Sequence, residues 1–165
     1  MNISSKAAFA ITALSILMPC ALIRAQNAST AAQTATEQSQ LLQGSWEGVE
    51  VGREAEGKCT MTITGNSIDF QGSNKDEWYR TIFTLPLATD PKQLRATITD
   101  CPQPDYVGKV ALSIFKIEDG TLTLVGHAPG APEAPQTFDG DKTSRSFVFK
   151  KAQSQKENTE PSKSK

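Results

Sequence analysis

The sequence has few of the side chains from which catalytic and metal sites are usually built. It contains one histidine, His127, and three cysteines among 165 residues. A catalytic base needs a nucleophile or an orienting carboxylate within reach, and the sequence around His127 shows neither. The cysteines and the histidine also lie far apart along the chain, which argues against a cysteine-based metal site. The sequence therefore predicts no enzyme activity, no catalytic residues, no metal and no cofactor.

Motifs for phosphate binding and hydrolysis are missing as well. There is no Gly-rich phosphate loop, no G-x-S-x-G turn and no H-E-x-x-H pair. Residues 139–141 (DGD) indicate a turn, because the remainder of a calcium-binding loop does not follow them. The formal net charge is −1, so the chain has no basic excess of the kind that binds nucleic acid.

The longest apolar run lies near the N-terminus. Residues 7–23 (AAFAITALSILMPCALI) follow a short polar start that carries Lys6. This order is typical of a secretory signal, so we expect residues 1–25 to be removed and the chain to be extracytoplasmic, either periplasmic or secreted, without a stable membrane span. One alternative is a membrane anchor, for which about 17 residues interrupted by Pro19 are at the short limit. The other is a lipoprotein anchored through Cys20.

Two cysteines, Cys59 and Cys101, remain after removal of the signal. An even number of cysteines in an exported chain favours a disulfide over two free thiols. We therefore expect a bond between Cys59 and Cys101.

Segments of low complexity flank a single domain. Residues 26–40 are mainly Ala, Thr, Gln and Ser without an apolar period, and residues 152–165 contain no large apolar side chain. Both are expected to be disordered, the first as a linker and the second as a tail. Residues 36–42 favour one helical turn leading into the domain, which is predicted over residues 41–151.

The domain consists of short alternating segments separated by turn signals. Cys59, Met61 and Ile63 alternate with polar residues, as expected of a strand with one buried face. The segment Glu118-Asp119-Gly120 indicates a hairpin. The predicted strands cover residues 44–51, 58–64, 67–71, 78–85, 93–99, 109–117, 121–126 and 145–150.

This pattern predicts an all-β fold. About eight short antiparallel strands, each with one apolar face, close most economically into an up-and-down barrel, and a sandwich is the alternative. The strand over 109–117 is apolar on both faces from Val110 to Ile117. We therefore expect another segment of the chain to cover its outer side.

Several short motifs, in order, resemble a known family. Residues 42–46 (LQGSW) contain the G-x-W pattern with which lipocalin-like barrels begin. Residues 83–85 (FTL), 90–92 (DPK) and 112–124 (LSIFKIEDGTLTL) follow. Together they are similar to a small lipocalin-like domain family described as an uncharacterised planctomycete domain, and the resemblance covers residues 41–151.

The resemblance carries expectations about fold but no established activity. Residues 135–138 (PQTF) are similar to the family's R-P-x-x-F segment, with Ala134 where arginine is usual. The resemblance implies a lipocalin-like barrel in which Trp46 closes one end beneath a basic residue of the last strand, Arg145 or Lys150.

Two functions remain open for such a barrel. Small inward residues such as Ala96 favour a cavity and a non-enzymatic protein that binds a small apolar ligand. Large inward residues favour a filled core, and then an envelope-associated module for protein interaction or structure, with an unknown protein partner. The candidate ligand-binding residues are Phe70, Phe83, Ala96 and Phe115.

Overall fold

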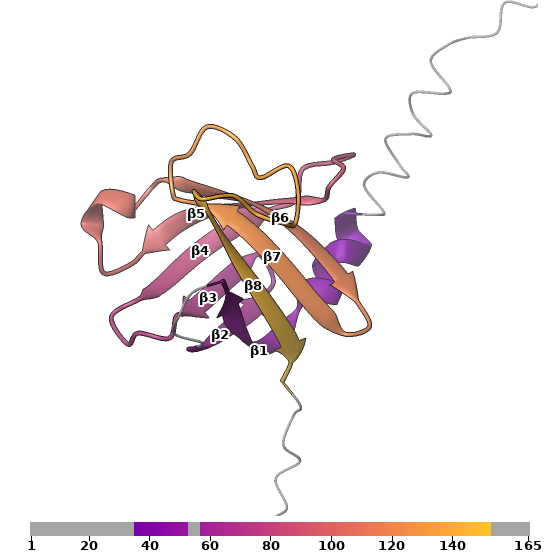
Figure 1. Cartoon of the computed structure of the whole chain (residues 1–165), viewed down its shortest axis with the longest axis horizontal. Coiled ribbons are helices and arrows are strands. Elements are labelled where there is room, and N and C mark those ends of the chain that lie inside the picture. The colour runs from indigo at the N-terminus through magenta and orange to yellow at the C-terminus, as the bar shows by residue number, and fades with distance from the viewer. Residues whose placement is uncertain (1–34, 53–56, 153–165) are drawn as a thin grey trace, which may run out of the picture.

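A computed structural model describes residues 35–52 and 57–152, which form eight antiparallel strands and a short helix (Figure 1). The helix covers residues 35–42, so the folded part includes residues 35–40 of the predicted linker. The predicted signal lies outside the described residues. No helix in the described part is both long and apolar enough to cross a membrane. The strands are β1 (Gly44–Val51), β2 (Lys58–Thr64), β3 (Ser67–Gln71), β4 (Trp78–Thr84), β5 (Gln93–Asp100), β6 (Val110–Glu118), β7 (Thr121–His127) and β8 (Ser144–Lys151).

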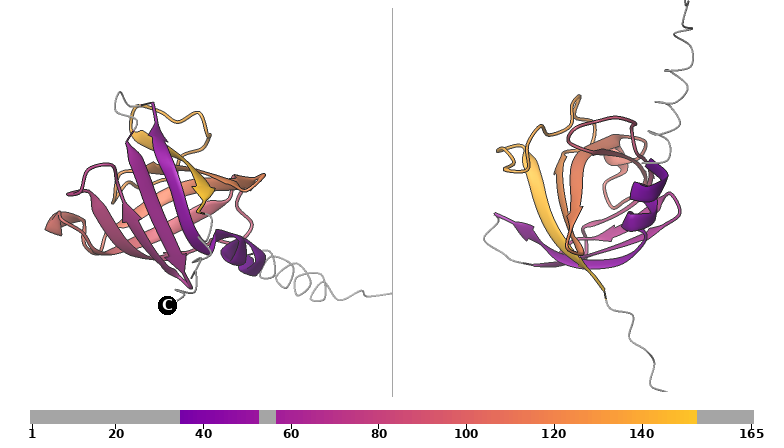
Figure 2. Two further views of the ribbon diagram at one scale, coloured as in Figure 1. Left: turned by 90° about the horizontal axis from the view of Figure 1, so that it is seen from below. Right: turned by 90° about the vertical axis from the view of Figure 1, so that its right-hand side faces the viewer.

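The strands form one closed barrel (Figure 2). Each strand pairs with the next along the chain, and β8 pairs with β1 to complete the circle. The predicted all-β, up-and-down topology is confirmed, and the predicted strand bounds agree to within one residue at each end. The agreement follows from the alternation, because β2 and β5 bury every second residue.

Gly48 allows β1 and β8 to close the barrel. A Cβ atom at Gly48 would lie 2.3 Å from the carbonyl oxygen of Val148 and 2.6 Å from the ring of Phe149. Gly48 and Phe149 are register partners across this seam. The missing side chain at Gly48 therefore leaves room for the fully buried Phe149 ring inside the barrel.

One end of the barrel, here named the closed end, is sealed by Trp46 and the helix. Trp46 is 1% exposed, and its Nε1 donates to the carbonyl oxygen of Leu42 at 2.8 Å. The ammonium of Lys151 lies 5.2 Å from the centre of the Trp46 ring. The prediction that Trp46 closes one end therefore fits this structure.

The basic residue over Trp46 is Lys151, so the expectation of Arg145 or Lys150 is wrong. Register across the β1–β8 seam places Trp46 opposite Lys151. Lys150 directly precedes Lys151, so it points to the other face of the strand, where it is exposed. Arg145 is the second residue of the same strand and lies at the opposite end of the barrel, which we name the mouth.

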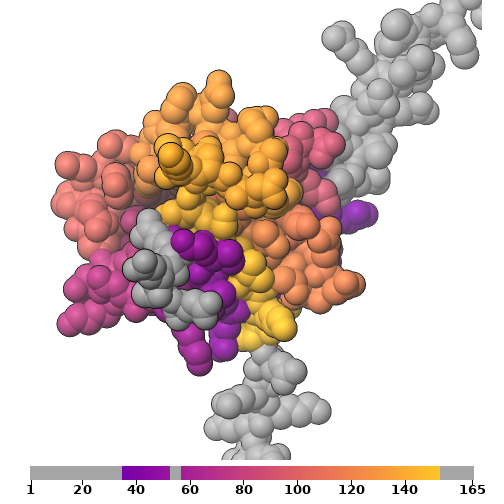
Figure 3. All heavy atoms as spheres, in the orientation of Figure 1, coloured from indigo at the N-terminus to yellow at the C-terminus, as the bar shows by residue number. Residues whose placement is uncertain are grey.

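The β7–β8 connection, residues 128–143, covers the outer side of β6 as expected. A second apolar cluster outside the barrel combines Leu112, Ile114 and Val125 with Ala134 of the connection. Phe138 packs against the same cluster. The connection arches over this side in Figure 1 and forms a layer of atoms across it in Figure 3. Ala134 is therefore buried against the barrel wall.

The predicted disulfide is absent. Cys59 and Cys101 are both free and buried. Cys59 lies on β2 and Cys101 follows β5, so three inter-strand steps of about 4.8 Å separate their strands, whereas bonded cysteines have Cα atoms within about 7 Å. Each thiol instead lies beside a nearby carbonyl oxygen, that of Gly57 at 3.7 Å and that of Gln103 at 3.0 Å.

Candidate functional site

The half of the barrel next to the mouth contains a cavity of ≈ 160 Å³. Inward side chains of β2 to β8 form its walls, and the exposed Ala128 contributes to its rim, so the cavity reaches solvent. The walls are predominantly apolar, with Met61, Ile68, Ile98 and Phe147 among them. The barrel therefore has a hollow half and a filled half.

Four small residues on β5, β6 and β7 create this space. Ala96 and Ala111 are register partners across β5 and β6, and Ser113 and Gly126 are partners across β6 and β7. All four line the cavity. A Cβ atom at Gly126 would lie 2.9 Å from Oγ of Ser113, so even one additional methyl group would crowd this wall.

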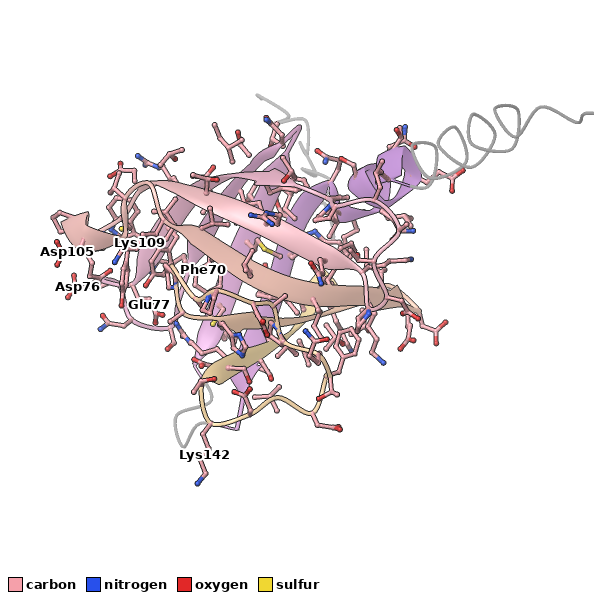
Figure 4. All side chains as sticks on the ribbon, turned by 90° about the horizontal axis from the view of Figure 1, so that it is seen from above. Phe70, Asp76, Glu77, Asp105, Lys109 and Lys142 are labelled. Carbon is pink, nitrogen blue, oxygen red and sulfur yellow. The ribbon has the colours of Figure 1, made fainter. Side chains whose placement is uncertain are left out.

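The four predicted ligand-binding residues separate into two groups. Phe70 and Ala96 line the cavity (Phe70 in Figure 4). Phe83 and Phe115 are 4% and 2% exposed and belong to the main hydrophobic core, and neither is among the described lining residues. The structure therefore brings Phe70 and Ala96 together and places Phe83 and Phe115 in the packed interior.

Thr81 is the most unusual polar residue of the cavity wall. It follows the inward pattern of β4 and is 7% exposed. Its hydroxyl oxygen is buried, and within the described residues it has no hydrogen-bond partner. A β-bulge shifts the β4–β5 register between Arg80 and Thr81, and the hydroxyl of Thr99, the extra residue, donates to the carbonyl oxygen of Arg80 at 3.0 Å. The carbonyl oxygen of Arg80 at the bulge therefore has a partner, whereas the described residues offer none to the Thr81 hydroxyl.

The mouth carries a partly buried ion-pair cluster, which we name the mouth triad: Glu50, Glu77 and Arg145. The guanidinium of Arg145 donates from Nε and Nη2 to the two carboxylate oxygens of Glu50, each at 2.7 Å. Its Nη1 donates to Oε1 of Glu77. The hydrogen bond to Glu50 is the main cause that raises the pKa of Arg145, so the guanidinium stays charged. Among the described residues, one cation therefore faces two carboxylates here.

The β3–β4 connection holds Glu77 in place (Figure 4). The carbonyl oxygen of Glu77 accepts from the backbone N–H of Gly72 at 2.8 Å and from Nε2 of Gln71 at 3.0 Å. A Cβ atom at Gly72 would lie 2.6 Å from Oε2 of Glu77, so the glycine leaves room for the carboxylate.

Ionisable groups near the cavity also respond to burial. Burial, followed by the charge of Glu77, raises the pKa of Tyr79 above its usual value. Burial likewise raises the pKa of the Cys59 thiol, which favours its neutral form.

His127 fastens the β7–β8 connection and also lines the cavity. Its Nδ1 lies 2.9 Å from the carbonyl oxygen of Glu133, and its Nε2 lies 3.4 Å from a carboxylate oxygen of Asp141. Asp141 accepts from the hydroxyl and the backbone N–H of Thr143, and these bonds are the main cause that lowers its pKa to about 2. Across the described ranges, no group of three or more His, Cys, Asp or Glu side chains is placed to hold a metal ion.

Glu50, Glu77 and Thr81 were not among the residues singled out from sequence, and Arg145 was singled out only as a candidate partner of Trp46. Signals for them exist in the alternation. Glu50 continues the inward series of Trp46 and Gly48 on β1, and Arg145 begins the inward series of Phe147 and Phe149 on β8. A charged residue at an inward strand position predicts a buried partner of opposite charge.

Comparisons with known proteins add no further assignment. No family model, no curated protein and no solved structure matches this chain. The eight-stranded barrel is compatible with a lipocalin-like fold.

Proposed function

We propose that this protein binds a small apolar ligand in the barrel cavity without transforming it chemically. The single observation that carries the proposal is the ≈ 160 Å³ space behind the mouth, walled by predominantly apolar side chains. Ligand sites are concave, mostly apolar and supplied with a few polar groups, and this cavity has each of these properties.

The size of the cavity sets the size of the ligand. An engineered apolar cavity of about 150 Å³ in another protein holds benzene. The ligand proposed here is therefore about the size of one ring or a short aliphatic chain, and a long acyl chain is too large. The filled half of the barrel explains this limit, because Phe83, Phe115 and Phe149 occupy the remaining interior.

Binding of toluene tests the proposal. We expect saturable chemical-shift changes in the methyl groups of Met61, Ile68 and Ile98 when toluene is added to the protein. Ala96→Leu fills the cavity and is expected to abolish these changes while the variant remains folded. Thr97→Leu, at the neighbouring exposed position of β5, is the matched control and should bind as the wild type does.

The filled-core alternative makes the opposite prediction for the same variant. If the barrel had no usable space, Ala96→Leu would overpack it and destabilise it by about 1–3 kcal/mol. Such destabilisation, together with no toluene-dependent shift in the wild type, would overturn ligand binding in favour of an interaction or structural module.

We further propose that the protein acts outside the cytoplasm after removal of residues 1–25. The signal-like order of that segment supports this proposal. The intact mass of the protein isolated from its native source tests it. A mass that includes residues 1–25, or a lipid on Cys20, would contradict it.

A further inference from the structure

We propose that the cavity selects an uncharged, ring-sized ligand bearing a hydroxyl group, and that Thr81 is the residue that hydrogen-bonds this group. This inference rests on the proposed function and specifies the chemical class of its ligand.

The buried hydroxyl of Thr81 indicates that the ligand carries a polar group. Thr81 is 7% exposed, its oxygen has no hydrogen-bond partner in the described part of the chain, and it belongs to the cavity wall. A buried hydroxyl without a partner is unfavourable, and valine has nearly the same shape without that penalty. A ligand hydroxyl in the cavity supplies the missing partner. Ser113, also 7% exposed, adds a second hydroxyl to the same lining.

The mouth triad argues against an anionic ligand. Among the described residues that line the cavity, Arg145 is the one permanently cationic side chain. Both carboxylate oxygens of Glu50 and one of Glu77 already accept from it. Within the part of the chain that the structure describes, a ligand carboxylate at the mouth therefore meets two carboxylates and a guanidinium that is already engaged.

A cationic ligand is disfavoured for a different reason. The two carboxylates are already engaged by Arg145, and the walls deeper in the cavity are apolar. A cation inside such walls loses its hydration, and neither Glu50 nor Glu77 is among the described residues that line the cavity. The site therefore fits a neutral molecule with one hydrogen-bonding group.

Four probes of similar size test the proposal at neutral pH: toluene, phenol, benzoate and benzylamine. Dissociation constants are measured by methyl NMR titration of the full-length protein and of Thr81→Val. We expect the ratio of phenol to toluene affinity to fall about 3- to 10-fold in Thr81→Val, the equivalent of one net hydrogen bond. Thr84→Val, at an exposed position of the same strand, should leave the ratio unchanged, and Thr81→Ser, which keeps the hydroxyl, should largely preserve it. Benzoate and benzylamine should bind at least about 10-fold more weakly than phenol, since each brings an unpaired charge into the cavity.

Each contrary result has a distinct meaning. If toluene and phenol bind but Thr81→Val leaves their ratio unchanged, a buried water serves the hydroxyl and the assignment of Thr81 fails, although the cavity proposal stands. Benzoate or benzylamine binding as tightly as phenol would overturn the uncharged class. If none of the four probes binds the wild type, the proposed function itself fails.

Discussion

Arg145→Met tests whether the mouth triad behaves as a buried ion-pair network. The substitution removes three charge-assisted hydrogen bonds, two to the carboxylate of Glu50 and one to that of Glu77. The side chains of Glu50 and Glu77 are 10% and 23% exposed, so water compensates for little of the loss. Removing one partner of a buried pair typically costs about 3–5 kcal/mol, and the partial exposure of Glu77 favours the lower value. We expect the free energy of unfolding to fall by about 3 kcal/mol.

Urea unfolding followed by tryptophan fluorescence measures this loss. Small proteins have urea m-values of about 1–3 kcal/mol/M, so the midpoint should fall by about 1–3 M. Arg80→Met is the matched control, because Arg80 also faces two carboxylates, those of Asp69 and Asp100, but its side chain is 63% exposed. The control should cost at most about 1 kcal/mol.

A further variant distinguishes two causes of the lost stability: the missing attraction to Arg145 and the burial of carboxylate charge. In Arg145→Met combined with Glu50→Gln and Glu77→Gln, the two carboxylates that lose Arg145 are replaced by neutral amides, and we expect most of the lost stability to return. Equal, small losses in Arg145→Met and Arg80→Met would refute the reasoning, because the triad would then contribute no more than an exposed pair.

Three further predictions concern other parts of the barrel. Phe115→Ala should lower the free energy of unfolding by about 3–5 kcal/mol in urea unfolding, since Phe115 is 2% exposed in the packed half, and a loss below about 1 kcal/mol would contradict that placement. Alkylation in denaturant without reductant, mapped by mass spectrometry, should label both Cys59 and Cys101. Labelling of the native protein should be slow, because burial raises the pKa of the Cys59 thiol. A cross-linked pair that stays unlabelled would show that the two cysteines form a disulfide after all. An NMR titration should give Asp141 a pKa of about 2. Its contribution to the β7–β8 connection is then fully present above the usual aspartate pKa of 3.8 and is lost as the pH falls through about 2. Thr143→Ala should raise this pKa toward the usual range, and an unchanged value would exclude Thr143 as its cause.

The strands were predictable from sequence because their cause is local. Cys59, Met61 and Ile63 alternate with threonines, and this pattern determines one buried and one exposed face whatever surrounds the strand. The same reasoning required a cover for β6, whose outward Leu112 and Ile114 needed apolar neighbours, and the β7–β8 connection supplies it.

The disulfide and the depth of the cavity were not predictable, because both depend on how the barrel closes. Cys59 shares the inner surface expected from its strand, but only the strand order reveals how far β2 lies from β5. Phe70 and Phe83 likewise both face inward, while their position along the barrel axis depends on the stagger of all eight strands. The alternation of β4 places Thr81 inward, but it does not indicate that its hydroxyl has no partner among the described residues.

The pairing of the first and last strands also determines how the domain is presented to its surroundings. β1 begins and β8 ends at the closed end, where Trp46 stands opposite Lys151. Both connections from the domain to the rest of the chain therefore leave from the side remote from the mouth. An affinity tag, a fusion partner or a surface linkage attached through either extension is therefore joined to the barrel at its base.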